Sequence, residues 1–227
     1  MHRQQDLGKD RFSWLLRQRG LLFFDESRLE ERIQVRSKRP DFYVEPSSFP
    51  PILVEVEGFS KRDSHLAVPE RILKRLRVAV GHAASQLAPY REMKIPTLVV
   101  LDNARKVRLP LGKNDLLNLF GLLEWHKPIN VITGDSAGPA YLTGSDDSFH
   151  VLGPEWNNHV SAVAVNLPKD GYQYDEPPER ERPMRLRVLH NPYASVPLPA
   201  RVFDDAEDEN ILLVENQWRV FRGTDVP

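Results

Sequence analysis

One short segment constrains the fold of this 227-residue chain more than any other: the apolar run TLVVL at residues 97–101, introduced by Pro96. A strand without polar alternation is buried on both faces, which is typical of parallel strands covered by helices. Residues 52–57 form a second strand, with Ile52, Val54 and Val56 on one face and Glu55 and Glu57 on the other. Between them, residues 69–91 predict a long amphipathic helix. A strand, a helix and a second strand in this order predict an α/β fold with a mixed sheet flanked by helices.

The remaining segments supply further elements with less definition. Apolar spacing and turn residues predict helices at residues 10–20 and 114–124, and strands at residues 21–24, 39–44, 129–133, 160–167 and 185–189. Residues 211–221 are expected to close the fold as a strand or hairpin, and the Pro-rich residues 191–200 to lack regular structure. The acidic run at residues 204–209 is interpreted as a solvated turn.

Charge and composition narrow the function classes. Residues 1–113 carry 22 Lys+Arg and 14 Asp+Glu, whereas residues 114–227 carry 9 and 18. The basic half favours a polyanionic partner, and the shift in composition suggests a core at residues 1–110 with a C-terminal extension at 111–227 that packs on or extends its sheet. The chain has no cysteine, which excludes disulfides, thiolate catalysis and zinc fingers. No apolar run is long enough for a membrane span and the N-terminus is polar, so a cytoplasmic protein without membrane contact is expected.

Three carboxylates form the candidate site. Glu55 and Glu57 share one face of their strand, and the PSSFPP turn at residues 46–51 allows Asp41 to lie on a neighbouring strand. We expect the three to converge at the edge of a sheet. Carboxylate oxygens suit Mg²⁺ or Mn²⁺, which assist phosphodiester hydrolysis by activating water and neutralising charge. Glu55 and Glu57 could instead be the solvated face of an ordinary edge strand.

These residues give the chain a resemblance to the PD-(D/E)XK nuclease superfamily, which has the restriction-endonuclease-like fold. The resemblance covers residues 6–103 and rests on Pro40-Asp41, on Glu55-Val56-Glu57, on Gln86 in the long helix and on the apolar strand after it. It implies an αβββαβ core in which Asp41 and Glu55 bind the metal. It also implies that Glu57 positions or deprotonates water and that Gln86 supports the site from the helix.

The chain departs from the family pattern at Glu57, which stands where the family has a lysine. Some restriction endonucleases are known to use an E-x-E variant, and Lys61 is the nearest candidate for a replacement lysine. The expected function is a metal-dependent nuclease, most consistent with DNA as substrate; the alternative is an inactive nuclease-fold module that binds nucleic acid or protein. The residues expected to contact the phosphate backbone are Lys61, Arg71, Lys74 and Arg75.

A G-x-S-x-G match at residues 134–138 suggests a serine hydrolase, with His82 and Asp102 upstream. Its flanks do not predict the helix that such an elbow needs, so a Gly/Ser-rich turn is the preferred interpretation. The seven histidines show no zinc-binding spacing.

Overall fold

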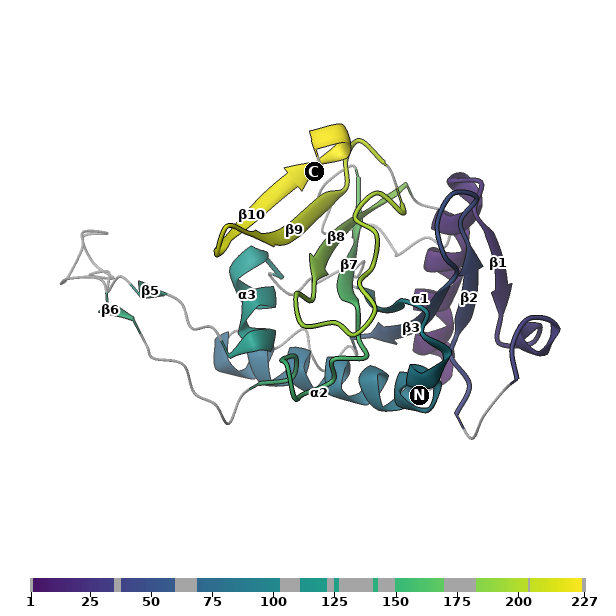
Figure 1. Cartoon of the computed structure of the whole chain (residues 1–227), viewed down its shortest axis with the longest axis horizontal. Coiled ribbons are helices and arrows are strands. Elements are labelled where there is room, and N and C mark those ends of the chain that lie inside the picture. Colours follow the sequence, from purple (N-terminus) through teal and green to yellow (C-terminus); the bar gives the residue numbers. More distant parts are fainter. Residues whose placement is uncertain are drawn as a thin grey trace.

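An eight-stranded mixed sheet forms the centre of the molecule, with strand order β1-β2-β3-β4-β7-β8-β9-β10. The computed structural model describes residues 2–34, 38–59, 69–102, 111–121, 125–126, 141–142, 150–169, 183–203 and 205–225. Figure 1 shows the first strands at one end of the sheet and the C-terminal hairpin at the other. The predicted α/β class with a mixed sheet is confirmed.

The first part of the chain supplies two long helices and four strands. In order they are α1 (His2–Gln18), β1 (Leu22–Asp25), the 3-10 helix η1 (Leu29–Glu31), β2 (Phe42–Glu45), β3 (Ile52–Gly58), α2 (Pro69–Leu87), the 3-10 helix η3 (Ala88–Met93) and β4 (Thr97–Asp102). β1, β2 and β3 pair antiparallel, and β3 pairs parallel with β4. The helix α2 is the crossover that a parallel pair requires.

The second part of the chain continues the same sheet. It contains α3 (Lys113–Leu117), the 3-10 helix η4 (Asn118–Phe120), the short pair β5 (Trp125–His126) and β6 (Tyr141–Leu142), then β7 (Ala162–Pro168), β8 (Met184–His190), β9 (Glu209–Val214), β10 (Gln217–Arg222) and the 3-10 helix η6 (Gly223–Asp225). β7 pairs parallel with β4, so the strands after residue 110 extend the sheet that the first strands begin.

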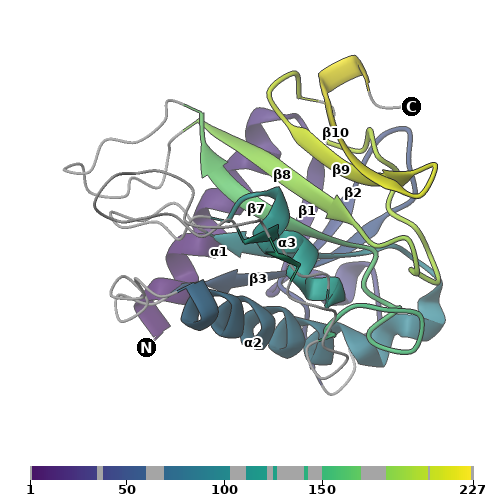
Figure 2. The same cartoon turned by 90° about the vertical axis from the view of Figure 1, so that its left-hand side faces the viewer.

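The sheet has a core on each face. Alternate residues of β3 and β4 pack with α1 on one side and with α2 on the other, because successive side chains of a strand point to opposite faces. Figure 2 shows α2 along one side of the sheet and α1 behind it. All six residues of β4 are buried, which confirms that the apolar run is a strand covered on both faces. Among the helices that the structure describes, none has both the length and the apolar character that crossing a bilayer requires.

Gly20 ends α1 and turns the chain into β1. Its φ is +63°, and the N–H of Leu21 bonds the Leu16 carbonyl at 3.0 Å while the N–H of Gly20 bonds the Arg17 carbonyl at 3.0 Å. This is the Schellman arrangement, in which a left-handed glycine satisfies the last carbonyls of a helix. The predicted stop at Gly20 is confirmed, whereas the predicted start at residue 10 is wrong because the helix begins at His2.

One further prediction differs from the structure, and others lie outside the described residues. The helix predicted at residues 114–124 is only α3 followed by η4, since Gly121 at φ +68° ends it. The strand predicted at residues 129–133 and the G-x-S-x-G match at 134–138 lie outside the described residues. Residues 211–221, expected to form a strand or hairpin, lie in the hairpin of β9 and β10, with Glu215 and Asn216 both at positive φ in its turn.

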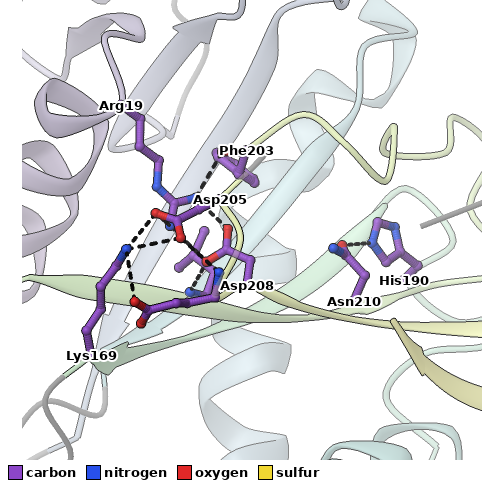
Figure 3. A network of polar contacts seen from close by, with 9 residues as sticks. Arg19, Lys169, His190, Phe203, Asp205, Asp208 and Asn210 are labelled. Carbon is purple, nitrogen blue, oxygen red and sulfur yellow. Dashed lines mark hydrogen bonds and ion pairs between the residues drawn. The ribbon is translucent and has the colours of Figure 1, made fainter. Parts of the chain in front are cut away.

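The acidic run at residues 204–209 is not simply a solvated turn. Asp208 and Glu209 are 3% and 5% exposed. Arg19 at the end of α1 donates to both carboxylate oxygens of Asp208, at 2.6 and 2.8 Å, and Lys169 donates to Asp205 at 2.8 Å (Figure 3). These ion pairs join the end of the first helix to the C-terminal strands. No local sequence pattern predicts them, because the partners are distant in the chain.

Candidate functional site

The register of β2 on β3 fixes the position of Asp41. Phe42 pairs with Val54, and the N–H of Asp41, directly before β2, donates to the Val54 carbonyl at 3.0 Å. β2 covers only the first part of β3, so the N–H of Val56 lies beyond the paired segment. The carboxylate of Asp41 accepts a hydrogen bond from that N–H at 2.7 Å. Asp41 therefore lies at the point where β2 and β3 part, and it is 4% exposed.

Glu55 and Asp41 form a pair of buried acids. Glu55 is 8% exposed, and its Oε2 has no hydrogen-bond partner among the described residues. Burial, followed by the negative charge of Asp41, raises the pKa of Glu55 to about 9. Burial also raises the pKa of Asp41, against the opposing effects of Lys9 and the Val56 N–H. When two buried carboxyls lie close together, burial and mutual repulsion favour a state in which one of them keeps its proton or the pair binds a cation.

Lys9 reaches this pair from α1. Its ammonium forms an ion pair with Asp41 Oδ1 and lies 3.4 Å from Glu26 Oε2. Burial alone would lower the pKa of Lys9, but the charges of Asp41 and Glu26 raise it above its usual value. The sequence offered Lys61 as the replacement lysine, and that residue lies outside the described part of the chain. No spacing rule predicts Lys9, because only packing of α1 on the sheet brings it to Asp41.

Glu57 makes a different contact. Its carboxylate is bonded to Nδ1 of His82 on α2, and the side chain of His82 is 52% exposed. Gln86, one turn further along α2, lies with its amide nitrogen 3.4 Å from Nε2 of the same imidazole. The sequence assigned Gln86 to this site, whereas His82 was named only as an upstream partner of the G-x-S-x-G match. The spacing of four between His82 and Gln86, which places both on one helix face, is the signal that could have identified His82 as a site residue.

The prediction that all three carboxylates converge at one site is therefore wrong. Among the residues that the structure describes, no group of three or more His, Cys, Asp or Glu side chains is placed to hold a metal ion. Asp41 and Glu55 interact with each other, whereas Glu57, although near enough to raise the pKa of Glu55, is bonded to His82. Glu55 and Glu57 are also not the solvated face of an edge strand, since β3 is an interior strand and Glu57 is 7% exposed.

An open cleft of about 300 Å³ leads to Asp41 from the side of α1 and β1. It is lined by Lys9, Asp10, Ser13, Arg17, Asp25, Glu26, Ser27, Asp41 and Phe42. Four carboxyl side chains and two basic ones give this lining a cation-attracting balance. The cleft suits a small cation or water more than a polyanion.

Basic residues lie on α2 instead. Lys74 is exposed and Arg75 is half-buried; the side chain of Arg71 and the whole of Lys61 lie outside the described part. Lys74, Val78, His82 and Gln86 follow each other at intervals of four and so form one stripe along the helix. That stripe begins at Lys74 and includes His82, the residue that contacts Glu57.

No family model, no curated protein and no solved structure matches this chain. Its functional assignment therefore depends on the geometry of Asp41, Glu55 and the side chains around them.

Proposed function

We propose that this protein is a metal-dependent nuclease that hydrolyses phosphodiester bonds, with DNA as its substrate. The observation that carries the proposal is the buried pair of Asp41 and Glu55 where β2 and β3 part, joined there by the ammonium of Lys9. The element order α1-β1-β2-β3-α2-β4 and the strand order β1-β2-β3-β4 support a restriction-endonuclease-like core.

The chemistry of the pair fits a divalent cation. Its donors are carboxylate oxygens, which Mg²⁺ and Mn²⁺ prefer, and Glu55 Oε2 is buried without a described partner. A cation there would compensate charge that burial makes costly. Asp41 and Glu55 would hold the ion, and waters and substrate oxygens would complete its coordination.

When bound, the ion would supply Lewis acidity toward a phosphate oxygen and make a coordinated water more acidic. The chain's own groups do the positioning. Asp41 is fixed by the Val56 N–H, and Lys9 places a positive charge and N–H donors beside the acid pair. Lys9 therefore supplies a lysine at the site, although the chain has Glu57 at the sequence position where the family has its lysine.

The substrate strand is expected to approach along α2. Lys74 and Arg75 place positive charge on the helix that carries His82 and Gln86, whereas the cleft beside α1 has more acidic than basic side chains. Contacts between these cations and phosphates would position a strand without reading its sequence.

A second candidate is a nuclease-like module without catalysis that binds nucleic acid or protein. Two observations favour it: the ammonium of Lys9 already compensates Asp41, and Glu57 stands at the usual lysine position. Under this alternative the Lys9–Asp41 pair is a structural tie between α1 and β2.

Thermal unfolding with and without Mn²⁺, together with cleavage of supercoiled plasmid, separates the two. A nuclease predicts a rise in Tm with Mn²⁺ in the wild type, because a ligand of the folded state alone stabilises it. Asp41→Asn and Glu55→Gln should lose both the Mn²⁺-induced rise and cleavage. Glu155→Gln, an exposed carboxylate away from the site, is the matched control and should keep both. DNA binding without any Mn²⁺-induced rise or cleavage would favour the inactive module.

A further inference from the structure

The contacts of His82 define its tautomer. The Glu57 carboxylate accepts a hydrogen bond from the imidazole, so Nδ1 of His82, the atom that it contacts, carries the hydrogen. In the neutral ring the lone pair is then on Nε2, the atom that lies 3.4 Å from the Gln86 amide nitrogen. The amide N–H of Gln86 donates toward this lone pair. If Nε2 gains a proton, the same amide can present its oxygen after rotation.

The burial of the two partners is unequal in an informative way. Glu57 is 7% exposed, whereas the side chain of His82 is 52% exposed. A buried carboxylate that holds Nδ1–H fixes the orientation of the ring, so the lone pair on Nε2 faces the Gln86 amide, and a reacting water must take the place of that amide N–H. This is how a carboxylate prepares an imidazole to take a proton from a reacting hydroxyl or water.

A purely structural role for this contact is the competing explanation. It would tie α2 to β3, but the apolar side of α2 already does so: Leu76, Ala79, Val80, Ala83, Ala84 and Leu87 are all buried in the core on that face. A half-exposed imidazole adds little to such packing. Its position on the exposed stripe of α2, in contact with the buried acid Glu57 of β3, suits a group that meets substrate.

We propose that His82 is the general base of the site. Nε2 takes a proton from the attacking water while the water oxygen bonds to phosphorus and the bond from phosphorus to the leaving oxygen breaks. The leaving oxygen takes a proton from solvent, and His82 later returns its proton to solvent. Glu57 and Gln86 are positioning residues that act through the imidazole. This inference rests on the nuclease proposal and assigns the base within it.

Single-turnover cleavage of plasmid in Mn²⁺ tests the assignment. His82→Ala should lower the rate by about 10²–10³-fold. It should leave the Mn²⁺-induced rise in Tm unchanged, because His82 does not hold the ion. Added imidazole should restore part of the rate in His82→Ala, which loss of a structural tie would not allow. Glu155→Gln, the exposed control away from the site, should retain the wild-type rate.

A measurement without metal or substrate checks the orientation. Nitrogen-15 NMR of the imidazole should show the hydrogen of His82 on Nδ1 in the wild type and a shift toward Nε2 in Glu57→Gln. Cleavage by His82→Ala within threefold of the wild-type rate, or a wild-type hydrogen on Nε2, would overturn the assignment of the base and leave the nuclease proposal standing. A wild type that never cleaves DNA would overturn both.

Discussion

At the scale of single residues, the site is governed by the cost of burying charge. Asp41 forms an ion pair with Lys9 and accepts a hydrogen bond from the N–H of Val56. Glu55, in contrast, has one carboxylate oxygen with no hydrogen-bond partner among the described residues. Burial, followed by the negative charge of Asp41, raises the pKa of Glu55 to about 9. Without a cation, Glu55 therefore holds a proton at neutral pH.

The stability of the protein should depend on this proton. Because the folded state binds it more tightly than the unfolded state, in which Glu55 has its ordinary value of 4.5, the stabilisation is complete below about pH 4.5 and disappears as the pH rises through 9. Glu55→Gln stays neutral, so with EDTA present it should exceed the wild type by about 2 kcal/mol or more at pH 8. The two should be similar at pH 4.5. Urea unfolding at both pH values measures this, and a Gln variant that is less stable at pH 8 would contradict it.

Binding of a divalent ion should release that proton. A carboxyl must be deprotonated before it can ligate a metal, so Mg²⁺ binding at pH 7.5 is expected to release about one proton from Glu55. Isothermal titration calorimetry in two buffers with different ionisation enthalpies counts the protons. Binding that is independent of the buffer would show that Glu55 is not a ligand.

At the scale of elements, α1 is held on the sheet by a buried ion pair as well as by apolar packing. Arg11 Nη1 donates to Asp102 Oδ2 at 2.5 Å, and both residues are 1% exposed. The contact joins α1 to the end of β4. It also fixes the part of α1 that carries Lys9, so the position of the site lysine depends on it.

Arg11→Met should destabilise the protein strongly. Removing the guanidinium breaks the buried ion pair between Arg11 and Asp102, which costs about 3–5 kcal/mol in comparable pairs. The control is Arg219→Met, which removes an exposed pair with Glu215 and should cost no more than about 1 kcal/mol. Urea unfolding of both variants gives the comparison. Equal losses would mean that the Arg11 contact contributes no more than a surface pair.

At the scale of the whole molecule, the two halves of the chain share one sheet. β4 lies between β3 and β7, and β7 belongs to the second half. Arg19, directly after α1, binds Asp208 before β9, and Lys169 after β7 binds Asp205 (Figure 3). The acidic second half is therefore part of the scaffold that positions the site.

A fragment of residues 1–110 should not fold cooperatively. It would expose the β7-facing edge of β4, together with apolar side chains on both of its faces that are now covered by the second half. Thermal unfolding followed by circular dichroism should show a sharp transition for the full chain and a shallow or absent one for the fragment. A cooperative transition of the fragment near the full-chain Tm would identify residues 1–110 as an independent domain.

The sequence by itself determined the elements whose pattern is local. The sequence predicted the buried strand β4, the alternating strand β3 and the end of α1 at Gly20, because side-chain period and turn residues act over a few positions. The same period predicted that Glu55 and Glu57 share a face.

Only the tertiary structure decided which partners these acids have. The register of β2 on β3 places Asp41 beside Glu55, and the packing of α1 places Lys9 beside Asp41. The packing of α2 places His82 in contact with Glu57. The tertiary structure likewise buried Asp208 against Arg19, where the acidic run alone indicated a solvated turn. The physical reason is that charge is costly to bury unless compensated, and the compensating groups come from elements distant in the chain, whose meeting no local pattern encodes.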